Sequence, residues 1–359
     1  MHLGLFYNTQ VYRTFVVSVL SFVMQLMDDP PDLGEHFAQV VRLLAPGPGN
    51  WISLADASHL EKGFGFHGSF QNPCWTSLAA KMRVAVTVAN DHHTKAVELE
   101  SLILSRPRRP FPEWNSRSFF TVLDKCMRYL SQHGITEQTV RQNLQSSGLH
   151  GMSFQRCAET LISTRLDKTY FANARIRQKL MIWKVHGVPA HLENRILRNF
   201  RLLKIWCSPR VLSIYFKTVW NGWVTDDRMK ELIKKQGRVV RPCVLGCGRE
   251  VDRVEHYGRC SVYWQFLSRN RPAGIGIPIS LRSAETFLML SELCDEDKVR
   301  LALGMYALHC TVQHCRHHTT PANFDVFAML RQFLHRAATG SKAQYLLKWE
   351  AHPKGTAGN

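Results

Sequence analysis

Four potential metal ligands, two thirds of the way along the chain, constrain its fold more than any other feature of the sequence. They follow the spacing Cys243-x3-Cys247-x8-His256-x3-Cys260. Zn²⁺ prefers a tetrahedron of sulfur and nitrogen ligands, and two cysteines a few residues apart can fold the backbone around it. Gly246 and Gly248 flank Cys247 and favour the tight turns that such folding needs. The spacing therefore predicts one zinc ion in a small Cys3His knuckle.

The last two residues of this group, His256 and Cys260, are four positions apart, which is about one turn of a helix. We therefore expect both side chains on one face of a helix that begins near Asp252. All four ligands then come from the protein and no coordination position remains for a reactive water, which makes the zinc structural rather than catalytic. The alternative is that the three cysteines are buried thiols and that His256 is an ordinary core histidine.

A second group of cysteines and histidines lies nearer the C-terminus. It comprises His309, Cys310, His314, Cys315, His317 and His318. On a helix Cys310 and His314 share a face, as do His314 and His318, but a tetrahedral site needs ligands from a second element as well. The sequence leaves a second metal open and favours a histidine-rich helix end, where the helix dipole stabilises positive charge.

The charge balance limits the partners of the chain. The sequence has 46 Lys and Arg against 28 Asp and Glu, a net charge of +18 with a pI near 9.7. Most of the excess lies in residues 165–241, the basic belt, where 18 basic residues accompany five acidic ones. A solvated helix face normally mixes both signs, so this belt favours a polyanion, RNA or DNA. The expected contacts are Arg175, Lys179, Arg195, Arg198, Arg201, Lys204, Lys217, Lys234, Lys235, Arg238 and Arg241.

Nine aromatic residues are interleaved with these cations. They are Tyr170, Phe171, Trp183, Phe200, Trp206, Tyr215, Phe216, Trp220 and Trp223. Aromatic rings can stack on the bases of a single strand, but they also form protein cores. Phe200 and Trp206 fall on the apolar face of an amphipathic helix expected over residues 192–207. We therefore interpret most of the nine as core residues.

The periodicity of apolar residues predicts a mostly α fold with helical, bundle-like segments around the small zinc module. Breaks rich in proline and glycine divide the chain into five regions. These are helical residues 1–105, a helical linker at 106–170, the basic helical region 171–235, the zinc knuckle at 236–270 and C-terminal helices at 275–350.

The apolar stretch at residues 14–27 bears on the cellular compartment. It is 14 residues long, too short to cross a bilayer comfortably, and lacks the basic leader of a signal peptide. We interpret it as a buried helix. Five of the ten cysteines have no close partner in the sequence, which favours a reducing compartment; they are Cys74, Cys126, Cys157, Cys207 and Cys294. The expectation is an intracellular protein, in the nucleus or cytoplasm, without a membrane partner.

Motifs of common enzyme classes are absent from the sequence. It contains no P-loop, no GxGxxG after a strand, no HExxH and no Tyr-x-Asp-Asp motif of a two-metal polymerase. The adjacent acid pairs, such as Asp226-Asp227, are interpreted as helix caps or turns. A zinc hydrolase is disfavoured too, because a closed four-ligand site activates no water.

Several short motifs together resemble a known family. They are Tyr7-Asn8-Thr9, VVSVLSF at 16–22, GPGNW at 47–51, FGF at 64–66, SLAAKMRV at 77–84, WNGW at 220–223, the Cys/His group and Trp264. In this order they resemble the region after the polymerase palm in reverse transcriptases of non-LTR (LINE-like) retrotransposons. The resemblance covers nearly the whole chain but only the C-terminal third of such proteins.

This resemblance implies a function as well as a fold. Residues 1–105 would form the thumb-like region, and the Cys/His group would match the family's zinc ligands. The family synthesises DNA from an RNA template at a nicked target, and its C-terminal region grips template RNA and target DNA. Because the palm and its catalytic carboxylates would precede Met1, we expect a truncated, zinc-containing nucleic-acid-binding fragment of an RNA-directed DNA polymerase, without enzymatic activity of its own. A first helix without that palm would expose apolar surface. The alternative is a helical, zinc-stabilised protein–protein interaction module.

Overall fold

The computed structural model describes residues 4–49, 51–90, 119–146, 153–167, 170–185, 191–237, 239–248, 250–269, 283–317 and 325–346. Within these ranges the regular structure is helical, apart from one isolated β-bridge between Pro242 and Val251. The expectation of a mostly α fold is confirmed. No helix in the described ranges is both long enough and apolar enough to span a bilayer.

Two compact units make up the chain. Unit 1 comprises Met1–Asn8, Leu44–Ser69 and Phe171–Asn359, and unit 2 comprises Thr9–Leu43 and Phe70–Tyr170. This division differs from the five regions expected from the sequence, because residues 1–105 contribute to both units. The boundary after Tyr170 is common to both divisions.

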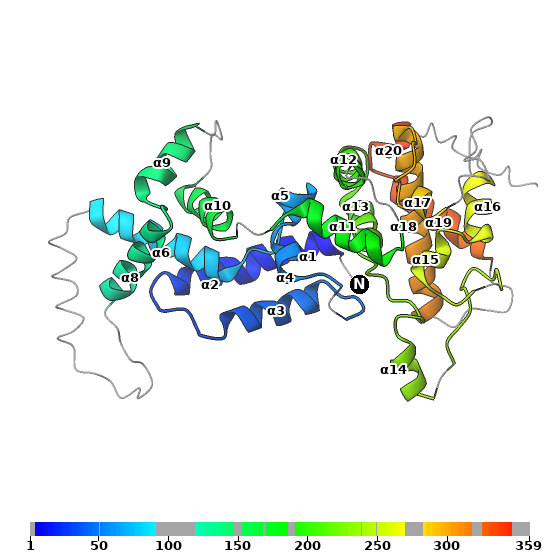
Figure 1. The fold of residues 1–359 in the computed structure, drawn as a ribbon, viewed down its shortest axis with the longest axis horizontal. Helices are drawn as coiled ribbons and strands as arrows, with labels where there is room; N and C mark the ends of the chain where they lie inside the picture. Colours follow the sequence, from blue (N-terminus) through cyan, green and yellow to red (C-terminus); the bar gives the residue numbers. More distant parts are fainter. Residues whose placement is uncertain are drawn as a thin grey trace, which may run out of the picture. The chain divides into compact units, whose positions relative to one another are not determined.

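Unit 2 is a helical assembly around α6. Its helices are the second part of α1 (Leu5–Val11), the π-helix η1 (Tyr12–Val17), α2 (Ser18–Met24), α3 (Leu33–Leu44), α6 (Pro73–Asn90), α8 (Phe119–Gln132), α9 (Glu137–Ser146) and α10 (Phe154–Leu166). Helices α2, α8 and α10 all contact α6 (Figure 1). The core between α6, α8 and α10 includes Met82, Leu130 and Ile162, all fully buried.

Residues 14–27 were expected to form a buried helix, and one face of η1 and α2 shows that this expectation was wrong. The stretch is helical, but it is not a buried helix: Phe15, Val19, Phe22 and Leu26 are all exposed, with Phe22 at 66%. These positions recur at helical spacing and therefore form one apolar stripe. The opposite face, with Val17 and Met24, is the buried one.

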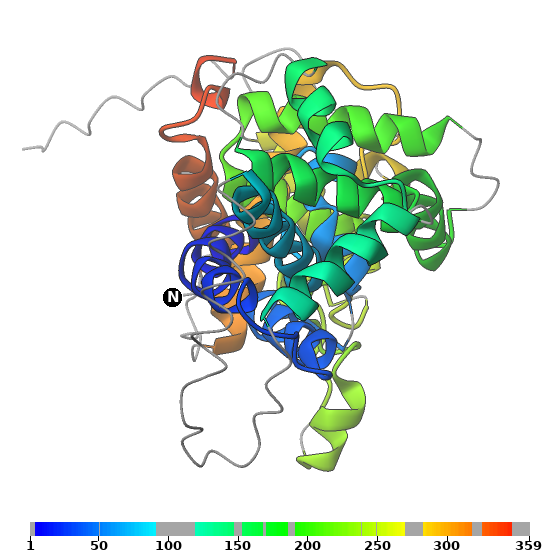
Figure 2. The ribbon, with the colours of Figure 1, turned by 90° about the vertical axis from the view of Figure 1, so that its left-hand side faces the viewer.

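Unit 1 contains the remaining helices. They are α4 (Leu54–Ser58), α5 (Leu60–Phe64), α11 (Ala172–Ile182), α12 (Leu192–Trp206), α13 (Pro209–Val219), α14 (Lys230–Lys235), α15 (Val254–Tyr257), α16 (Ser261–Arg269), α17 (Ala284–Phe287), α18 (Asp295–His317), α19 (Val326–Ala338) and α20 (Ala343–Leu346). The long α18 contacts α12, α13, α16 and α19. Helix α14 has no buried residue and stands apart from the other helices of the unit in two perpendicular views (Figures 1 and 2).

The aromatic residues of the basic belt mostly form the core of unit 1, as the sequence indicated. Phe200, Phe216 and Trp220 are buried, and the rings of Phe216 and Trp220 stack with centroids 4.0 Å apart. Phe64 from α5 packs edge-on against Trp220 at 4.8 Å. Three of the nine are not buried: Tyr170 and Trp206 are half-buried and Phe171 is exposed, so Trp206 is less buried than its place on the apolar helix face indicated.

Trp51 joins two of the sequence motifs. A Cβ atom placed on Gly47 would lie 2.3 Å from Trp51 Cδ1, and one placed on Gly222 would lie 2.3 Å from Trp51 Cε3. The indole therefore fits between two positions that only glycine can occupy without displacement. Its Nε1 donates a hydrogen bond to the carbonyl of Ala45 at 2.8 Å. The GPGNW and WNGW motifs thus meet at one packing contact.

Candidate metal centre and basic surface

The first two cysteines of the Cys3His cluster (Cys243, Cys247, His256 and Cys260) lie on a tight backbone loop. Gly246 and Gly248 have φ angles of 74° and 67°, in the left-handed region that favours glycine. The Cys243 amide donates to the Glu250 carbonyl at 2.9 Å, which closes the loop beside the β-bridge. The glycine spacing in the sequence correctly predicted these turns.

The four ligand atoms converge on one point. Cys243 Sγ lies 3.9 Å from Cys260 Sγ, Cys247 Sγ lies 3.2 Å from His256 Nε2, and all four atoms lie within 4.8 Å of one another. In a tetrahedron with metal bonds of about 2.0–2.3 Å, ligand atoms are separated by roughly 3.3–3.8 Å. Small side-chain adjustments therefore bring the cluster to the geometry of a bound ion.

The route by which His256 and Cys260 reach this point differs from the expectation. They do not share one helix: α15 ends at Tyr257, and Cys260 immediately precedes α16, which begins at Ser261. A turn at Gly258 lies between them, because the amide of Arg259 donates to the His256 carbonyl at 2.8 Å. Convergence comes from the ends of two short helices rather than from one helical face.

Neighbouring groups act differently on the individual ligands: the hydrogen bond with Cys260 and burial raise the pKa of Cys243, whereas the pKa of Cys260 is lowered. The second ring nitrogen of His256, Nδ1, lies 3.4 Å from a Glu250 carboxylate oxygen, which leaves Nε2 directed toward Cys247. A hydrogen bond from the Cys243 thiol lowers the pKa of Cys260. The cluster thus already favours a thiolate, which is the form that binds a metal ion.

A network of buried charges fixes the cluster to α18. Arg316, on α18, forms ion pairs with Asp252 and with Asp226, the latter at 2.8 Å. Asp252 also accepts a hydrogen bond from Tyr257 at 2.6 Å, and Arg241 pairs with Asp226 at 3.0 Å. The sequence interpretation of Asp226 as part of a cap or turn missed this role, since nothing in the sequence pairs it with residue 316.

The His309–His318 group does not form a second convergent site within the described part of the chain. His309 packs its ring edge-on against Trp223 at 5.0 Å, and burial lowers its pKa well below the usual value. It is therefore a neutral, half-buried histidine. His318 lies outside the described residues.

Four of the cations assigned to phosphate binding have partners inside the protein. Arg175 pairs with the fully buried Asp56 through Nη2 at 2.8 Å. Lys179 is 9% exposed and donates to the carbonyl of Trp51 at 3.0 Å. Burial lowers the pKa of Lys217 to about 8, and its Nζ donates to a carbonyl at 2.9 Å. Arg241 pairs with Asp226, as described above. These interactions show structural roles for all four.

The remaining cations of the set are more accessible. Arg198, Arg201, Lys234 and Lys235 are exposed, while Arg195 and Lys204 are half-buried. Four of them lie along α12: Arg195, Arg198, Arg201 and Lys204. Lys234 and Lys235 lie on α14. Arg238 lies outside the described residues. The accessible part of this predicted contact set is therefore smaller than the sequence indicated, and its described members lie on two helices.

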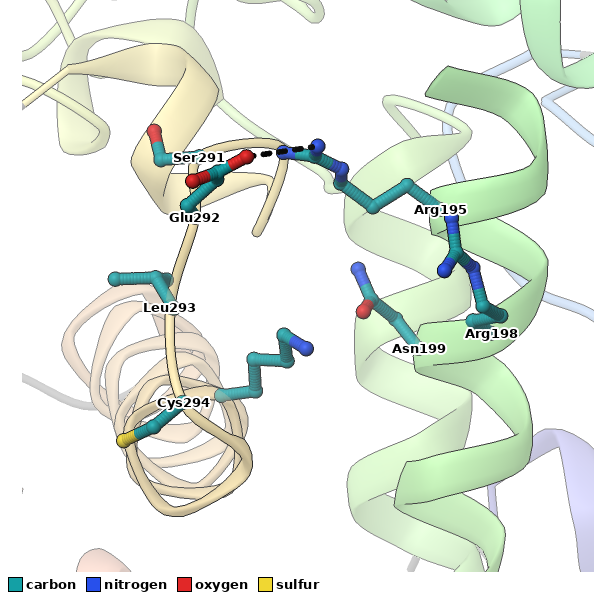
Figure 3. A pocket seen from close by; sticks show the side chains of 8 residues that line it. Arg195, Arg198, Asn199, Ser291, Glu292, Leu293 and Cys294 are labelled. Atoms are coloured by element: carbon teal, nitrogen blue, oxygen red, sulfur yellow. Dashed lines mark ion pairs between the residues drawn. The ribbon is translucent and has the colours of Figure 1, made fainter. Parts of the chain in front are cut away.

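A cavity of about 420 Å³ beside α12 adds a cation that the sequence interpretation missed (Figure 3). It is lined by Arg195, Arg198, Asn199, Ser291, Glu292, Leu293, Cys294 and Lys298. Lys298 lies on α18, more than fifty positions after the basic belt, so its distance along the chain hid its proximity to α12.

Comparisons of this chain with protein-family models, with curated proteins and with solved structures give no match.

Proposed function

We propose that the chain is a zinc-stabilised nucleic-acid-binding module, equivalent to the C-terminal region of the non-LTR reverse transcriptases that its sequence resembles. The observation that carries the proposal is the convergence of three thiols and one imidazole in a unit that also carries accessible cations on α12 and α14. In this proposal the module binds nucleic-acid strands through contacts with their phosphates.

The donor set supports zinc as the metal. Three thiolates and one imidazole are soft and borderline ligands, and a closed tetrahedron of this kind is typical of structural zinc. Cys243, Cys247, His256 and Cys260 would hold the ion. Its binding free energy would stabilise the local fold by about 10 kcal/mol or more, since the unfolded segment has no preformed site.

The metal is tested by elemental analysis of the purified chain. We expect one zinc per chain, and loss of most of it in Cys247→Ser. Cys294→Ser is the matched control, because Cys294 is an exposed cysteine outside the cluster. An unchanged one-to-one ratio in Cys247→Ser would exclude the assignment.

The accessible cations support nucleic-acid binding through phosphates. Arg201, Lys234 and Lys235 are exposed, and α14 carries only one acidic residue, Glu231. Each phosphate contact releases counterions, so the affinity falls with salt in proportion to the number of contacts. RNA and DNA both offer this backbone, and both belong in the test.

The binding test compares salt slopes. Changing Arg201, Lys234 and Lys235 together to alanine should reduce the slope of log K against log salt by about two for a single strand. The control changes three exposed cations of unit 2, Lys125, Arg128 and Arg141, which removes the same charge. Equal slopes for the two triple variants, or no slope in the parent protein, would refute phosphate contacts by the belt.

One observation favours the alternative of a protein-interaction module. The apolar stripe of Phe15, Val19, Phe22 and Leu26, which runs along η1 and α2 and ends just after α2, is exposed. Contiguous exposed apolar surface commonly marks contacts with another protein. Retained binding to a protein partner in a chain that shows no affinity for polynucleotides would favour this alternative.

A further inference from the structure

The cavity between α12 and the start of α18 has the size and charge of a small-anion site. Its volume of about 420 Å³ lies in the range of small-molecule sites. Three cationic side chains line it, Arg195 and Arg198 from α12 and Lys298 from α18. We propose that this cavity binds a phosphomonoester, the dianionic group found at the end of a nucleic-acid strand or on a free mononucleotide. This inference deepens the proposed function. It rests on that function where the phosphomonoester is the end of a nucleic-acid strand.

Arg195 is held in position for this role. Its guanidinium donates to the carbonyl of Leu290, and the side chain extends from α12 toward the loop that carries Glu292 (Figure 3). Arg198 projects from the same helix one turn later and is exposed. A planar guanidinium with several donors is suited to the oxygens of a phosphate group.

The inner wall of the cavity is closed. Asn199 lines it, is 1% exposed, and donates through Nδ2 to Tyr215 Oη at 3.2 Å and to the Met289 carbonyl at 3.1 Å. Tyr215 in turn donates to the Leu288 carbonyl at 3.1 Å. Because these polar groups are hydrogen-bonded to one another, protein bounds the cavity on this side. A terminal group can enter, and a terminal phosphate carries more negative charge than an internal diester.

Two carboxylates compete for the same cations, of which Glu292 lines the cavity and Asp295 does not. Glu292 lies 3.8 Å from Arg195, and Asp295 lies 3.2 Å from Lys298. Both acids are highly exposed, with Glu292 at 94%, so both can turn into solvent. Exposed ion pairs of this kind contribute little to stability. A dianion that reaches all three cations at once therefore displaces them.

The test measures binding of two single-stranded oligonucleotides that differ only in a 5′-phosphate or a 5′-hydroxyl, together with AMP. We expect about tenfold tighter binding of the phosphorylated strand, the effect of one additional charge-assisted contact. The double variant Arg198→Ala, Lys298→Ala should bring this ratio to about one. Arg201→Ala with Lys204→Ala is the matched control, since it removes two cations of α12 outside the cavity and should keep the ratio.

The outcomes separate the two proposals. Binding of both strands with a ratio near one, and no AMP binding that depends on Lys298, overturns the phosphomonoester site and leaves the proposed function intact. AMP binding lost in the cavity variant, without affinity for either strand, supports the site with a free nucleotide as its source and refutes the proposed function. Lys298→Arg should retain the preference, and thermal unfolding of each variant checks that the fold is preserved.

Discussion

Replacing Arg175 with methionine distinguishes a structural role of this residue from a role in nucleic-acid binding. Asp56 is fully buried and accepts from Arg175 Nε at 3.0 Å, from Arg175 Nη2 at 2.8 Å and from Trp220 Nε1 at 3.1 Å. Breaking a buried ion pair from one side typically costs about 3–5 kcal/mol. Arg175 is 28% exposed, and the bond from Trp220 remains, so we expect a cost at or somewhat below the lower end of this range, about 2–3 kcal/mol.

Urea unfolding at pH 7, followed by tryptophan fluorescence, measures this cost. With a slope of about 2–3 kcal/mol per M, the midpoint should fall by about 1 M. Arg201→Met is the control: it is exposed and should change the free energy of unfolding by less than about 0.5 kcal/mol. Adding Asp56→Asn to Arg175→Met should recover part of the loss, because the buried charge is then removed.

The pH dependence gives an independent check of the same reasoning. Burial acts to raise the pKa of Asp56, but the hydrogen bonds and charge of Arg175 outweigh it and hold this pKa below its usual value. In the parent protein this stabilisation is present above the unfolded pKa of about 4 and is lost as the pH falls below it. In Arg175→Met burial dominates and raises the pKa, so the cost should be greatest at neutral pH and shrink toward pH 4. Unchanged stability at pH 7 together with weakened nucleic-acid binding would refute the structural role.

Three further outcomes follow from packing and charge. Gly222→Ala should cost about 1–3 kcal/mol in thermal unfolding, because its Cβ meets Trp51 at 2.3 Å; Gly34→Ala, whose Cβ meets nothing within 4 Å, should not destabilise the protein. Arg316→Met should cost about 3–5 kcal/mol by urea unfolding and weaken zinc retention against a chelator, since it leaves two buried carboxylates without this partner; full retention would contradict the anchoring role. Phe22→Asp should raise solubility measured by light scattering without lowering the melting temperature, and a large drop in that temperature would mean that the apolar stripe is covered.

The metal cluster was predictable because its information is local. The spacing of Cys243 and Cys247 around glycines fixes a loop that any fold of this segment must accommodate. The helical content and the amphipathic helix at residues 192–207 were predictable for the same reason, and α12 spans Leu192–Trp206. Periodicity and turn chemistry act over a few residues and do not depend on distant partners.

The roles of individual cations were not predictable, because they depend on contacts between distant segments. Arg175 meets an aspartate that precedes it by 119 positions, and Arg316 meets Asp226 across 90 positions. Charge counting assigned Arg175 to a nucleic-acid-binding surface, although it pairs with a buried carboxylate, and it gave no role to Arg316. For the apolar stripe the error has the opposite sign. The hydrophobicity of residues 14–27 predicted that Phe22 is buried, but hydrophobicity does not show which face of a helix packs against another element, and Phe22 is exposed.

The position of Trp51 between two glycines also has a consequence for biosynthesis. Gly222 emerges from the ribosome 171 residues after Trp51, which at about 5–20 residues per second is a delay of roughly ten to thirty seconds. Unit 2 ends at Tyr170 and is complete before that moment. We therefore expect unit 2 to become protease-resistant first on arrested nascent chains, while residues 44–69 wait for their partners. During this interval we expect Trp51 and Phe64 to be exposed and accessible to chaperones. The core of unit 1 can form only after the second half of the chain has been synthesised.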